Sequence, residues 1–256
     1  MSSASQRLTI FYSLISFILG SQTNLWGNTC NDTGVIGKDE RIQITESNQA
    51  PIHQSIGALS IRYGNLSFSC SGTVVGPRHV LTAAHCLNIK NLYPDKVTFY
   101  PGLLGDPKTG KLPFGKFMSS KIKIYPAYLK AKIEQNDLAM VIFDENLPVD
   151  SLKMEVTNRK FNLRFTSLTV TGYPADKLKG TMWESNGRSK IKFRGNAGTH
   201  TLDTMPGMSG SSIRSGSKII AVHSSGSTNS KGVFVRNTAH FFSEESLSVV
   251  QGWIKD

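Results

Sequence analysis

The feature that most restricts the fold is a succession of short apolar runs, each ended by a turn-forming sequence such as Gly-Pro, Tyr-Pro-Asp or Gly-Tyr-Pro. Only the C-terminus has helical spacing, with Ser243 as N-cap and Leu247, Val250 and Ile254 on one face. Many strands with one terminal helix indicate a β-barrel or sandwich rather than alternating β-α-β units. We expect strands at 56–62, 67–75, 97–100, 138–143, 168–171, 189–194, 218–223 and 232–235.

The composition is that of an ordinary globular chain. Of the 256 residues 39% are hydrophobic and 18% are charged, which is not the profile of a disordered protein. The formal net charge of +11 is scattered, without a block of like charges or a nucleic-acid motif. We therefore expect a basic solvated surface and no nucleic-acid partner. The alternative is a loose, salt-sensitive attraction to acidic surfaces.

The N-terminus resembles a secretion signal. Arg7 precedes an apolar run at 8–19 that is too short to span a bilayer comfortably. We expect residues 1–20 to be a signal peptide, 21–34 a short pro-segment and 35–256 the mature domain of a secreted protein. An uncleaved N-terminal anchor is the alternative. No later segment approaches 18 apolar residues, so stable membrane insertion is not expected after signal removal.

Three cysteines are present, and two of them can pair in an exported protein. A disulfide between Cys70 and Cys86 would contribute about 3 kcal/mol by constraining the unfolded chain. Cys30 is then left over, which indicates a processed segment, a free thiol or an intermolecular partner.

Three segments carry candidate catalytic residues. Ser209 lies between Gly207 and Gly210, which let the backbone turn tightly and allow the amides of Gly207 and Ser209 to point at an oxyanion. A Gly/Ser surface turn is the alternative. His85 follows an apolar run, and Asp137 leads into another, where a buried carboxylate needs a partner such as His85. We predict His85 as base, Asp137 as its orienting acid and Ser209 as nucleophile.

The order of these residues, together with longer motifs, identifies a family. The order His, Asp, Ser is that of chymotrypsin, and no acid-then-histidine pair follows Ser209 as an α/β-hydrolase requires. Residues 70–86 resemble the histidine region of chymotrypsin-like proteases. More narrowly, 35–45, 170–177 and 181–187 resemble glutamyl endopeptidases, the bacterial-type branch that also contains the exfoliative toxins.

The resemblance covers 35 to 254 and implies a fold and an activity. The implied fold is all-β, with two six-stranded antiparallel β-barrels, a lobe boundary near 145–165 and a C-terminal helix. The implied activity is a serine endopeptidase that cleaves protein and peptide substrates after glutamate, and less well after aspartate. A monomer is expected.

The resemblance also implies a pocket for the substrate carboxylate. The matching positions are His223, Thr204 and the amine of Val35, which would supply charge-assisted hydrogen bonds to offset desolvation. The full-length chain is expected to be largely latent because Val35 then lacks a free amine. The strand that continues through Ser224 and Ser225 should pair with the substrate backbone.

Some positions depart from the family pattern. Pro206 replaces a glycine and removes one backbone donor, while Gly207 keeps its amide. Met208 stands where trypsin-like zymogens have an aspartate that binds the new N-terminus, which leaves that terminus free for substrate. We expect no cofactor and a metal-independent reaction, because the remaining histidines lack metal-ligand spacing; calcium sites leave weaker signatures. Two alternatives stay open, namely a serine protease of other specificity and a non-catalytic binding or toxin module.

Overall fold

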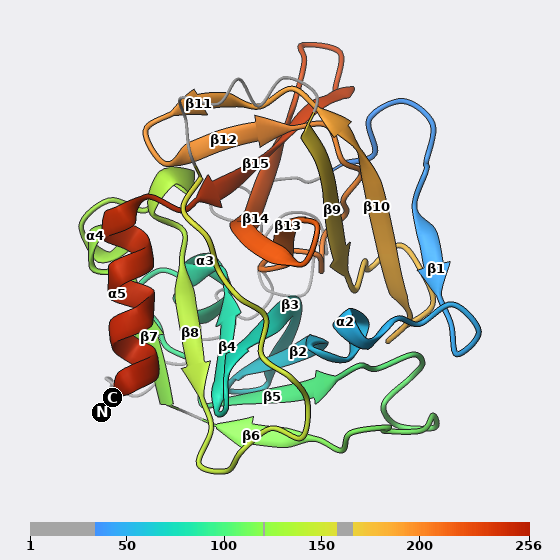
Figure 1. Ribbon diagram of the computed structural model, residues 1–256, viewed down its shortest axis with the longest axis vertical. Helices are drawn as coiled ribbons and strands as arrows, with labels where there is room; N and C mark the ends of the chain where they lie inside the picture. The colour runs from blue at the N-terminus through green and yellow to red at the C-terminus, as the bar shows by residue number, and fades with distance from the viewer. Residues whose placement is uncertain (1–33, 120, 158–165) are drawn as a thin grey trace, which may run out of the picture. The chain divides into compact units, whose positions relative to one another are not determined.

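The structure is a computed structural model that describes residues 34–119, 121–157 and 166–256 (Figure 1). The expected signal segment and Cys30 lie outside the described residues, as does all but the last residue of the expected pro-segment. The described elements, in chain order, are β1 (Ile42–Ile44), α2 (Pro51–Gln54), β2 (Ile56–Tyr63), β3 (Leu66–Gly76), β4 (His79–Thr82), α3 (Ala84–Leu87), β5 (Lys96–Pro101), β6 (Phe117–Ser119), β7 (Lys121–Ile124), α4 (Pro126–Lys130), the 3-10 turn η1 (Glu134–Asn136), β8 (Ala139–Ile142), β9 (Thr166–Gly172), β10 (Met182–Ser189), β11 (Lys192–Arg194), β12 (Ala197–His200), β13 (Ser212–Ser215), β14 (Lys218–Thr228), β15 (Phe234–Phe241) and α5 (Glu244–Lys255).

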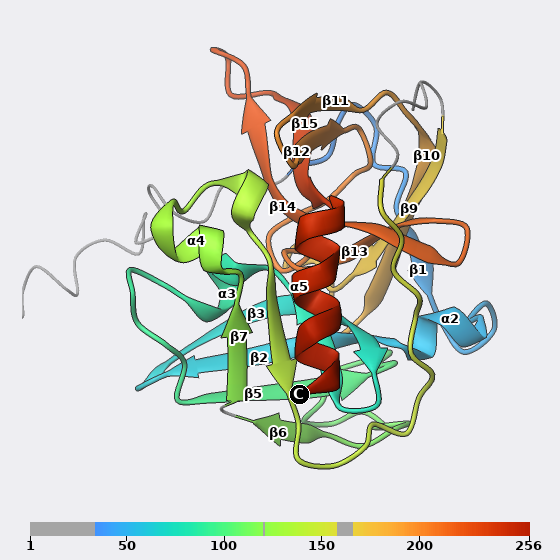
Figure 2. The ribbon, with the colours of Figure 1, turned by 60° about the vertical axis from the view of Figure 1, so that its left-hand side comes forward.

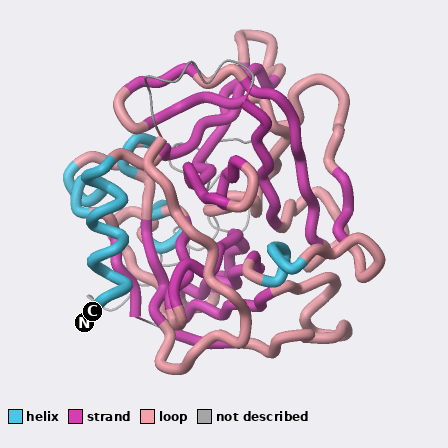
Figure 3. The backbone as a smooth tube through the Cα atoms, viewed as in Figure 1, coloured by secondary structure: helices cyan, strands magenta, loops and turns pink. Residues whose placement is uncertain are grey.

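Strand dominates the described chain, as Figure 3 shows, and the all-β prediction is confirmed. The run at 189–194 was wrongly taken as one strand, because β10 ends at Ser189 and β11 begins at Lys192. The strand predicted at 232–235 also starts too early in the sequence, since Gly232 has a φ of 75° in a turn and β15 begins at Phe234. Both differences arise where a turn or break interrupts an apolar run.

The prediction of a single helix was incomplete. α5 forms as expected, but α2, α3, α4 and η1 are additional short helical segments. Each is only about one turn long, so it is too short for a 3.6-residue apolar period to show in the sequence. None of the helices in the described ranges is long and apolar enough to cross a membrane.

The strands form two antiparallel sheets. The order is β1-β10-β9-β13-β14-β15-β12-β11 in one and β6-β5-β2-β3-β4-β8-β7 in the other. β6 and β7 follow each other closely in the chain yet pair with opposite edges, β5 and β8. β10 and β11 do the same with β9 and β12. Counting each of these pairs as one bent strand gives two six-stranded rings, to which β1 is added at the edge of the first.

Each sheet has a main core of its own, and β14 and the C-terminal helix also contribute to the core of the seven-stranded sheet. β15 belongs to the eight-stranded sheet, whereas Leu247, Val250 and Trp253 of α5 pack into the core of the seven-stranded sheet. α5 runs alongside β8 in both Figure 1 and Figure 2. The helix therefore holds the C-terminal part of the chain against the N-terminal sheet.

The motif at 181–187 has a structural explanation in β10. Glu184 Oε2 lies 3.0 Å from His53 Nε2 and 3.0 Å from Arg214 Nη2, and it accepts a 2.7 Å hydrogen bond from Thr171 Oγ1. Burial would raise the pKa of the Glu184 carboxyl, but these partners lower it. This ion cluster ties β10 to β9, β13 and α2, so Glu184 supports the fold.

We expect Ser243→Ala to destabilise the protein by about 1 kcal/mol, the usual cost of losing an N-cap. The Ser243 hydroxyl accepts a hydrogen bond from Ser246 N at the start of α5. Urea denaturation followed by circular dichroism measures the change. Ser248→Ala, at an exposed position within the same helix, is the matched control and should be neutral or slightly stabilising, because alanine favours a helix interior more than serine does. Equal effects of the two substitutions would contradict this role of the cap.

Candidate active site

Strand register brings His85 and Asp137 together. β4 pairs with β8 so that Thr82 lies opposite Ala139. α3, which carries His85, follows β4 directly, and Asp137 immediately precedes β8. The end of one strand and the start of its neighbour thus place the two side chains side by side.

The two residues form a buried, oriented pair. His85 Nδ1 lies 2.6 Å from Asp137 Oδ2, and His85 N donates to Asp137 Oδ1 at 2.9 Å. Ser224 Oγ donates a further hydrogen bond to Asp137 Oδ2. Only 8% of His85 and 2% of Asp137 are exposed. A carboxylate held by three donors fixes both the ring plane and the tautomer of the imidazole.

The interaction shifts the pKa values of His85 and Asp137 in opposite directions. Burial would lower the pKa of His85, but the charge and hydrogen bond of Asp137 outweigh it and the pKa is raised. Burial would raise the pKa of Asp137, but His85 and Ser224 lower it. The carboxylate is therefore ionised at neutral pH and stabilises a protonated His85.

Ser209 lies on a tight loop that is tied to both sheets. Gly207 and Gly210 have φ angles of 93° and 84°, which favour glycine. Gly210 N donates to His223 O on β14 at 2.9 Å, and Ser71 N on β3 donates to Ser209 O at 2.8 Å. The loop is buried on either side of Ser209, whereas Ser209 itself is half-exposed.

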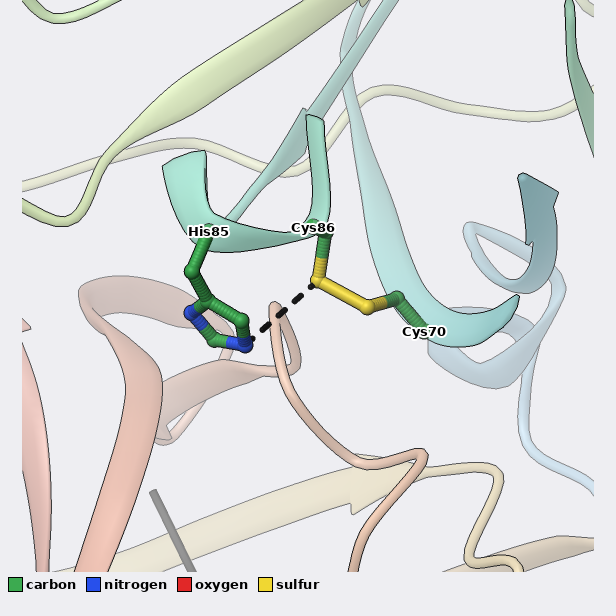
Figure 4. Close-up of side chains that lie close together, drawn as sticks. All are labelled: Cys70, His85 and Cys86. Atoms are coloured by element: carbon green, nitrogen blue, oxygen red, sulfur yellow. Dashed lines mark hydrogen bonds between the residues drawn. A yellow bond between two sulfur atoms is a disulfide. The ribbon is translucent and has the colours of Figure 1, made fainter. Parts of the chain in front are cut away.

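The disulfide between Cys70 and Cys86 lies between the histidine and the serine loop. Cys86 Sγ is 3.8 Å from His85 Nε2, as Figure 4 shows, and 3.9 Å from Ser209 O. Among the described residues no hydrogen bond joins Ser209 Oγ to His85, and such contacts are often longer in the resting state than in the reacting one. Cys70, His85 and Cys86 gather closely enough to suggest a metal site, but disulfide sulfurs are not the thiolates that bind metals.

The backbone amides of Gly207 and Ser209 are free to bind an anion. Neither donates a hydrogen bond to an atom in the described part of the chain. Pro206 O instead accepts a 2.7 Å hydrogen bond from Ala175 N. Because a trans peptide directs C=O and N–H to opposite sides, this bond turns the Gly207 N–H away from Ala175. The loss of a donor at Pro206 thus leaves the arrangement intact.

The predicted pocket residues Thr204 and His223 are both fully buried. Thr204 Oγ1 and His223 Nε2 have no hydrogen-bond partner in the described structure. His223 lies on β14, and its backbone N donates to Ser211 O at 2.8 Å, so the ring is anchored to the serine loop. Two polar atoms without a partner at such a position are unusual in a folded protein.

Val35 lies next to Thr204. Thr204 N donates to Gly34 O at 3.4 Å, and Gly34 is the residue bonded to Val35 N. Asn237 binds both Gly34 N and Gly34 O, at 3.1 and 2.8 Å. Asp203 accepts from Ile36 N at 2.8 Å. Asn237 and Asp203 thus clamp the chain on either side of Val35.

A second histidine stands behind His223. His200 Nε2 lies 3.3 Å from His223 Nδ1, and both rings are buried. Burial lowers the pKa of His200 to about 3. Burial, together with the nearby His200 and His85, lowers the pKa of His223 well below its ordinary value and outweighs the backbone of Thr238, which acts in the opposite direction. Both rings are therefore neutral, and a His200 N–H that donates to His223 Nδ1 leaves the His223 Nε2 atom protonated.

Sequence reasoning missed several residues of the site. Ser224 was expected only to line the substrate strand, whereas its hydroxyl binds Asp137; Ser225 pairs with Thr238 in the β14–β15 ladder. Adjacency to His223 was the one signal for Ser224. His200, Asn237 and Asp203 carry no motif, so only the pairing of distant strands reveals them.

Comparison with known proteins gives a consistent family. The chain matches the trypsin family over residues 44–242. It is 28% identical to an extracellular metalloprotease of Bacillus subtilis over 83% of this chain and 69% of that protein. It is 28% identical to a glutamyl endopeptidase of Bacillus licheniformis over 75% of this chain and 61% of that protein. It is 27% identical to a glutamyl endopeptidase of Staphylococcus aureus over 83% of this chain and 64% of that protein. The chain thus spans roughly two thirds of the length of these relatives.

Solved structures agree. A Glu endopeptidase in complex with MPD superposes with a TM-score of 0.74 and 26% identity, over 87% of this chain and all of that one. An inactivated protease paralogue of the scabies mite shares the fold alone, with a TM-score of 0.62 and 15% identity over 81% of this chain and 98% of that one. The family match includes both sheets and all three segments of the candidate site. The chain belongs to the trypsin family and is a chymotrypsin-fold serine protease related to the glutamyl endopeptidases.

Proposed function

We propose that this chain is a secreted endopeptidase that cleaves protein and peptide substrates after glutamate, and less well after aspartate, and acts as a monomer. The observation that carries the specificity is the pair of buried, unpartnered atoms Thr204 Oγ1 and His223 Nε2 beside the serine loop. Each unpaired buried donor costs about 1–3 kcal/mol, a cost that a bound carboxylate would remove. The B. licheniformis and S. aureus relatives named glutamyl endopeptidase support the same specificity.

The neutral histidine pair suits a carboxylate ligand. With His200 donating to His223 Nδ1, the His223 Nε2–H is directed as a donor, and the Thr204 hydroxyl is a second one. A carboxylate accepts hydrogen bonds from both groups. The NH₂ group of a glutamine side chain is itself a donor, so it could not accept a hydrogen bond from either.

The third donor would be the amine of Val35. In the intact chain Val35 N belongs to a peptide bond, and Gly34 O occupies the position beside Thr204 N. Cleavage before Val35 would remove that carbonyl and leave an ammonium group near Thr204, with Asp203 still holding Ile36 N. We therefore propose that the chain is largely latent until it is cut there. Secretion fits both the N-terminal apolar run and the disulfide, which persists in oxidising compartments.

The reaction would be acyl transfer by His85, Asp137 and Ser209. Ser209 Oγ attacks the backbone carbonyl carbon of the glutamate residue while His85 Nε2 accepts the hydroxyl proton. The amides of Gly207 and Ser209 bind the oxyanion. His85 then gives its proton to the leaving amine, the C–N bond breaks, and water releases the acyl group by the same steps. Asp137 stabilises the protonated imidazole throughout and stays ionised.

The chain beginning at Val35 should cleave peptides after Glu, with Asp slower and with Gln and Lys at least about tenfold slower, because only a carboxylate satisfies the pocket donors. The measurement is kcat/KM on four peptides that differ only at that residue. A serine-directed phosphonate should abolish cleavage and label Ser209, and Ser209→Ala should lose both. The uncut chain should be much slower than the chain that begins at Val35.

The outcomes of this experiment separate the parts of the proposal. His223→Gln should lose the preference for Glu over Gln, whereas His79→Gln, which replaces another buried histidine on β4, should keep it. Phosphonate-sensitive cleavage after other residues would retain the catalytic residues and reject the pocket. Absence of both cleavage and labelling would favour a non-catalytic binding module.

The acid side of the pH profile should lie above pH 6.5, because His85 must be neutral to accept a proton and its pKa is raised above that value. Activity therefore rises as pH increases through this pKa. Asp137→Asn removes the charge that raises it, so the acid limb should move to lower pH while kcat falls by about 10⁴-fold. The profile of kcat/KM against pH tests both, and an unmoved limb in the variant would contradict the assignment of Asp137.

Gly207→Ala should lower kcat by about 10²-fold or more, because it displaces an oxyanion donor. A Cβ at Gly207 would lie 2.5 Å from Tyr173 O, so the loop would have to shift. Gly216→Ala is the control, since Gly216 also has a positive φ, of 60°, but faces open space. A comparable loss of kcat in both variants would show a general backbone effect instead.

A further inference from the structure

A pocket of about 430 Å³ adjoins the candidate site and takes no part in the mechanism above. It lies between the loop that joins β5 to β6 and the loop that joins β9 to β10, over residues of β2 and β3. The two loops touch, because a Cβ at Gly180 would lie 2.1 Å from Gly105 O. The volume of the pocket is within the usual range for ligand pockets, which is roughly 300–1,000 Å³.

The pocket shares two walls with the catalytic centre. Cys70 lines it and is bonded to Cys86, whose sulfur lies 3.8 Å from His85 Nε2. Ala175 also lines it and is the residue that holds Pro206 O in the oxyanion loop. No residue of β14, the strand expected to pair with the acyl side of the substrate, lines it. The pocket therefore lies on the side of Ser209 where the leaving peptide departs.

The lining combines an apolar interior with a basic rim. Tyr100, Leu103 and Tyr173 are among the apolar residues, and the basic ones are Lys108, Lys177 and Lys179. Lys177 is already engaged, since its Nζ lies 3.0 Å from Asp39 and 4.4 Å from the centre of the Trp183 ring.

The other two lysines keep their charge available. Within the described residues, Lys108 and Lys179 form no ion pair and both are exposed. The nearest acid in sequence, Asp106, accepts from Lys108 N in its own turn. Two unpaired ammonium groups at the mouth of an apolar pocket match a ligand with an apolar body and a carboxylate.

We propose that this pocket selects the leaving side of the substrate and favours a large apolar residue followed by aspartate or glutamate. The proposal rests on the proposed endopeptidase function and narrows its substrates to acidic polypeptide segments. Neighbouring side chains of an extended peptide point to opposite faces, so when the apolar one enters the pocket the next one points out of it, toward the solvent side where the exposed Lys108 and Lys179 can reach it. The net charge of +11 acts in the same direction by attracting such segments.

Peptides with an unchanged cleavage residue test this. The pairs Leu-Asp, Leu-Asn, Ser-Asp and Ser-Asn are placed in turn at each register within the first three positions after the bond. We expect kcat/KM for Leu-Asp to exceed that for Leu-Asn about fivefold in one register, the size that exposed ion pairs allow. Leu-Asp should also exceed Ser-Asp in that register, and added salt should reduce the advantage of Asp.

Variants assign the effect to the rim. Lys108→Gln with Lys179→Gln should bring the Asp/Asn ratio close to one. Lys130→Gln with Lys218→Gln removes the same charge at lysines outside the pocket and should keep the ratio. Equal rates for Asp and Asn in every register, or a ratio that survives loss of the two rim lysines, would overturn the proposal.

The readout is independent of the proposed specificity. All ratios compare peptides with the same residue before the bond, so a chain that cleaves after another residue is tested with that residue. If the chain cleaves nothing, calorimetry on Ser209→Ala with the free leaving peptides gives the same comparison. Tighter binding of the Leu-Asp peptide than the Leu-Asn peptide would then support the pocket without the function, and equal binding would reject it.

Discussion

The arrangement of the candidate active site depends on the hydrogen bonds of Ser71, whose hydroxyl group is buried. Ser71 Oγ donates to Gly207 O at 2.9 Å and accepts from Tyr173 N at 3.0 Å, while Ser71 N donates to Ser209 O at 2.8 Å. Its own carbonyl accepts from Thr82 Oγ1 at 2.9 Å. Ser71 is on β3 of the seven-stranded sheet, and Tyr173, Gly207 and Ser209 lie in loops of the other lobe. One residue therefore fixes the position of the serine loop relative to the strand that leads to His85. Loss of any of these bonds would leave a buried polar group unpaired, which is why the loop has little freedom.

Hydrogen bonds between the lobes also explain why the candidate catalytic groups need both of them. Asp137 and His85 lie next to the ends of adjacent strands of the seven-stranded sheet, whereas Ser224, which completes the carboxylate's hydrogen bonds, comes from β14 of the other. Gly210 permits the closest approach, since a Cβ there would lie 2.1 Å from Thr82 Oγ1 and 2.4 Å from Ser71 O. A side chain at that point would push the lobes apart. Helix α5 follows β15 in the chain and packs into the core of the seven-stranded sheet, so it forms a second connection between the lobes.

Much of this could be predicted from the sequence, and the limits have physical causes. Strands, the terminal helix, the fold and the three catalytic candidates each follow from local patterns around His85, Asp137 and Ser209. The short strands and one-turn helices could not be predicted, because tertiary pairing rather than local periodicity stabilises them. Ser71, His200 and Asn237 were missed for a related reason. Their roles arise from neighbours that are distant in sequence, and a lone serine, histidine or asparagine carries no trace of such a neighbour.

In the proposed function, burial of uncharged histidines would let a basic protein bind an anionic side chain without a permanent charge beside it. A buried cation at this place would cost several kcal/mol, whereas neutral His200 and His223 cost far less, and the tautomer in which His200 donates to His223 Nδ1 directs the His223 Nε2–H as a donor. The charges of Lys108 and Lys179, in contrast, are exposed, so water solvates them. In the proposed function, the exposed lysines would attract an acidic substrate and favour a carboxylate on its leaving side. The buried His223 and Thr204 would distinguish a carboxylate from an amide at the residue before the cleaved bond.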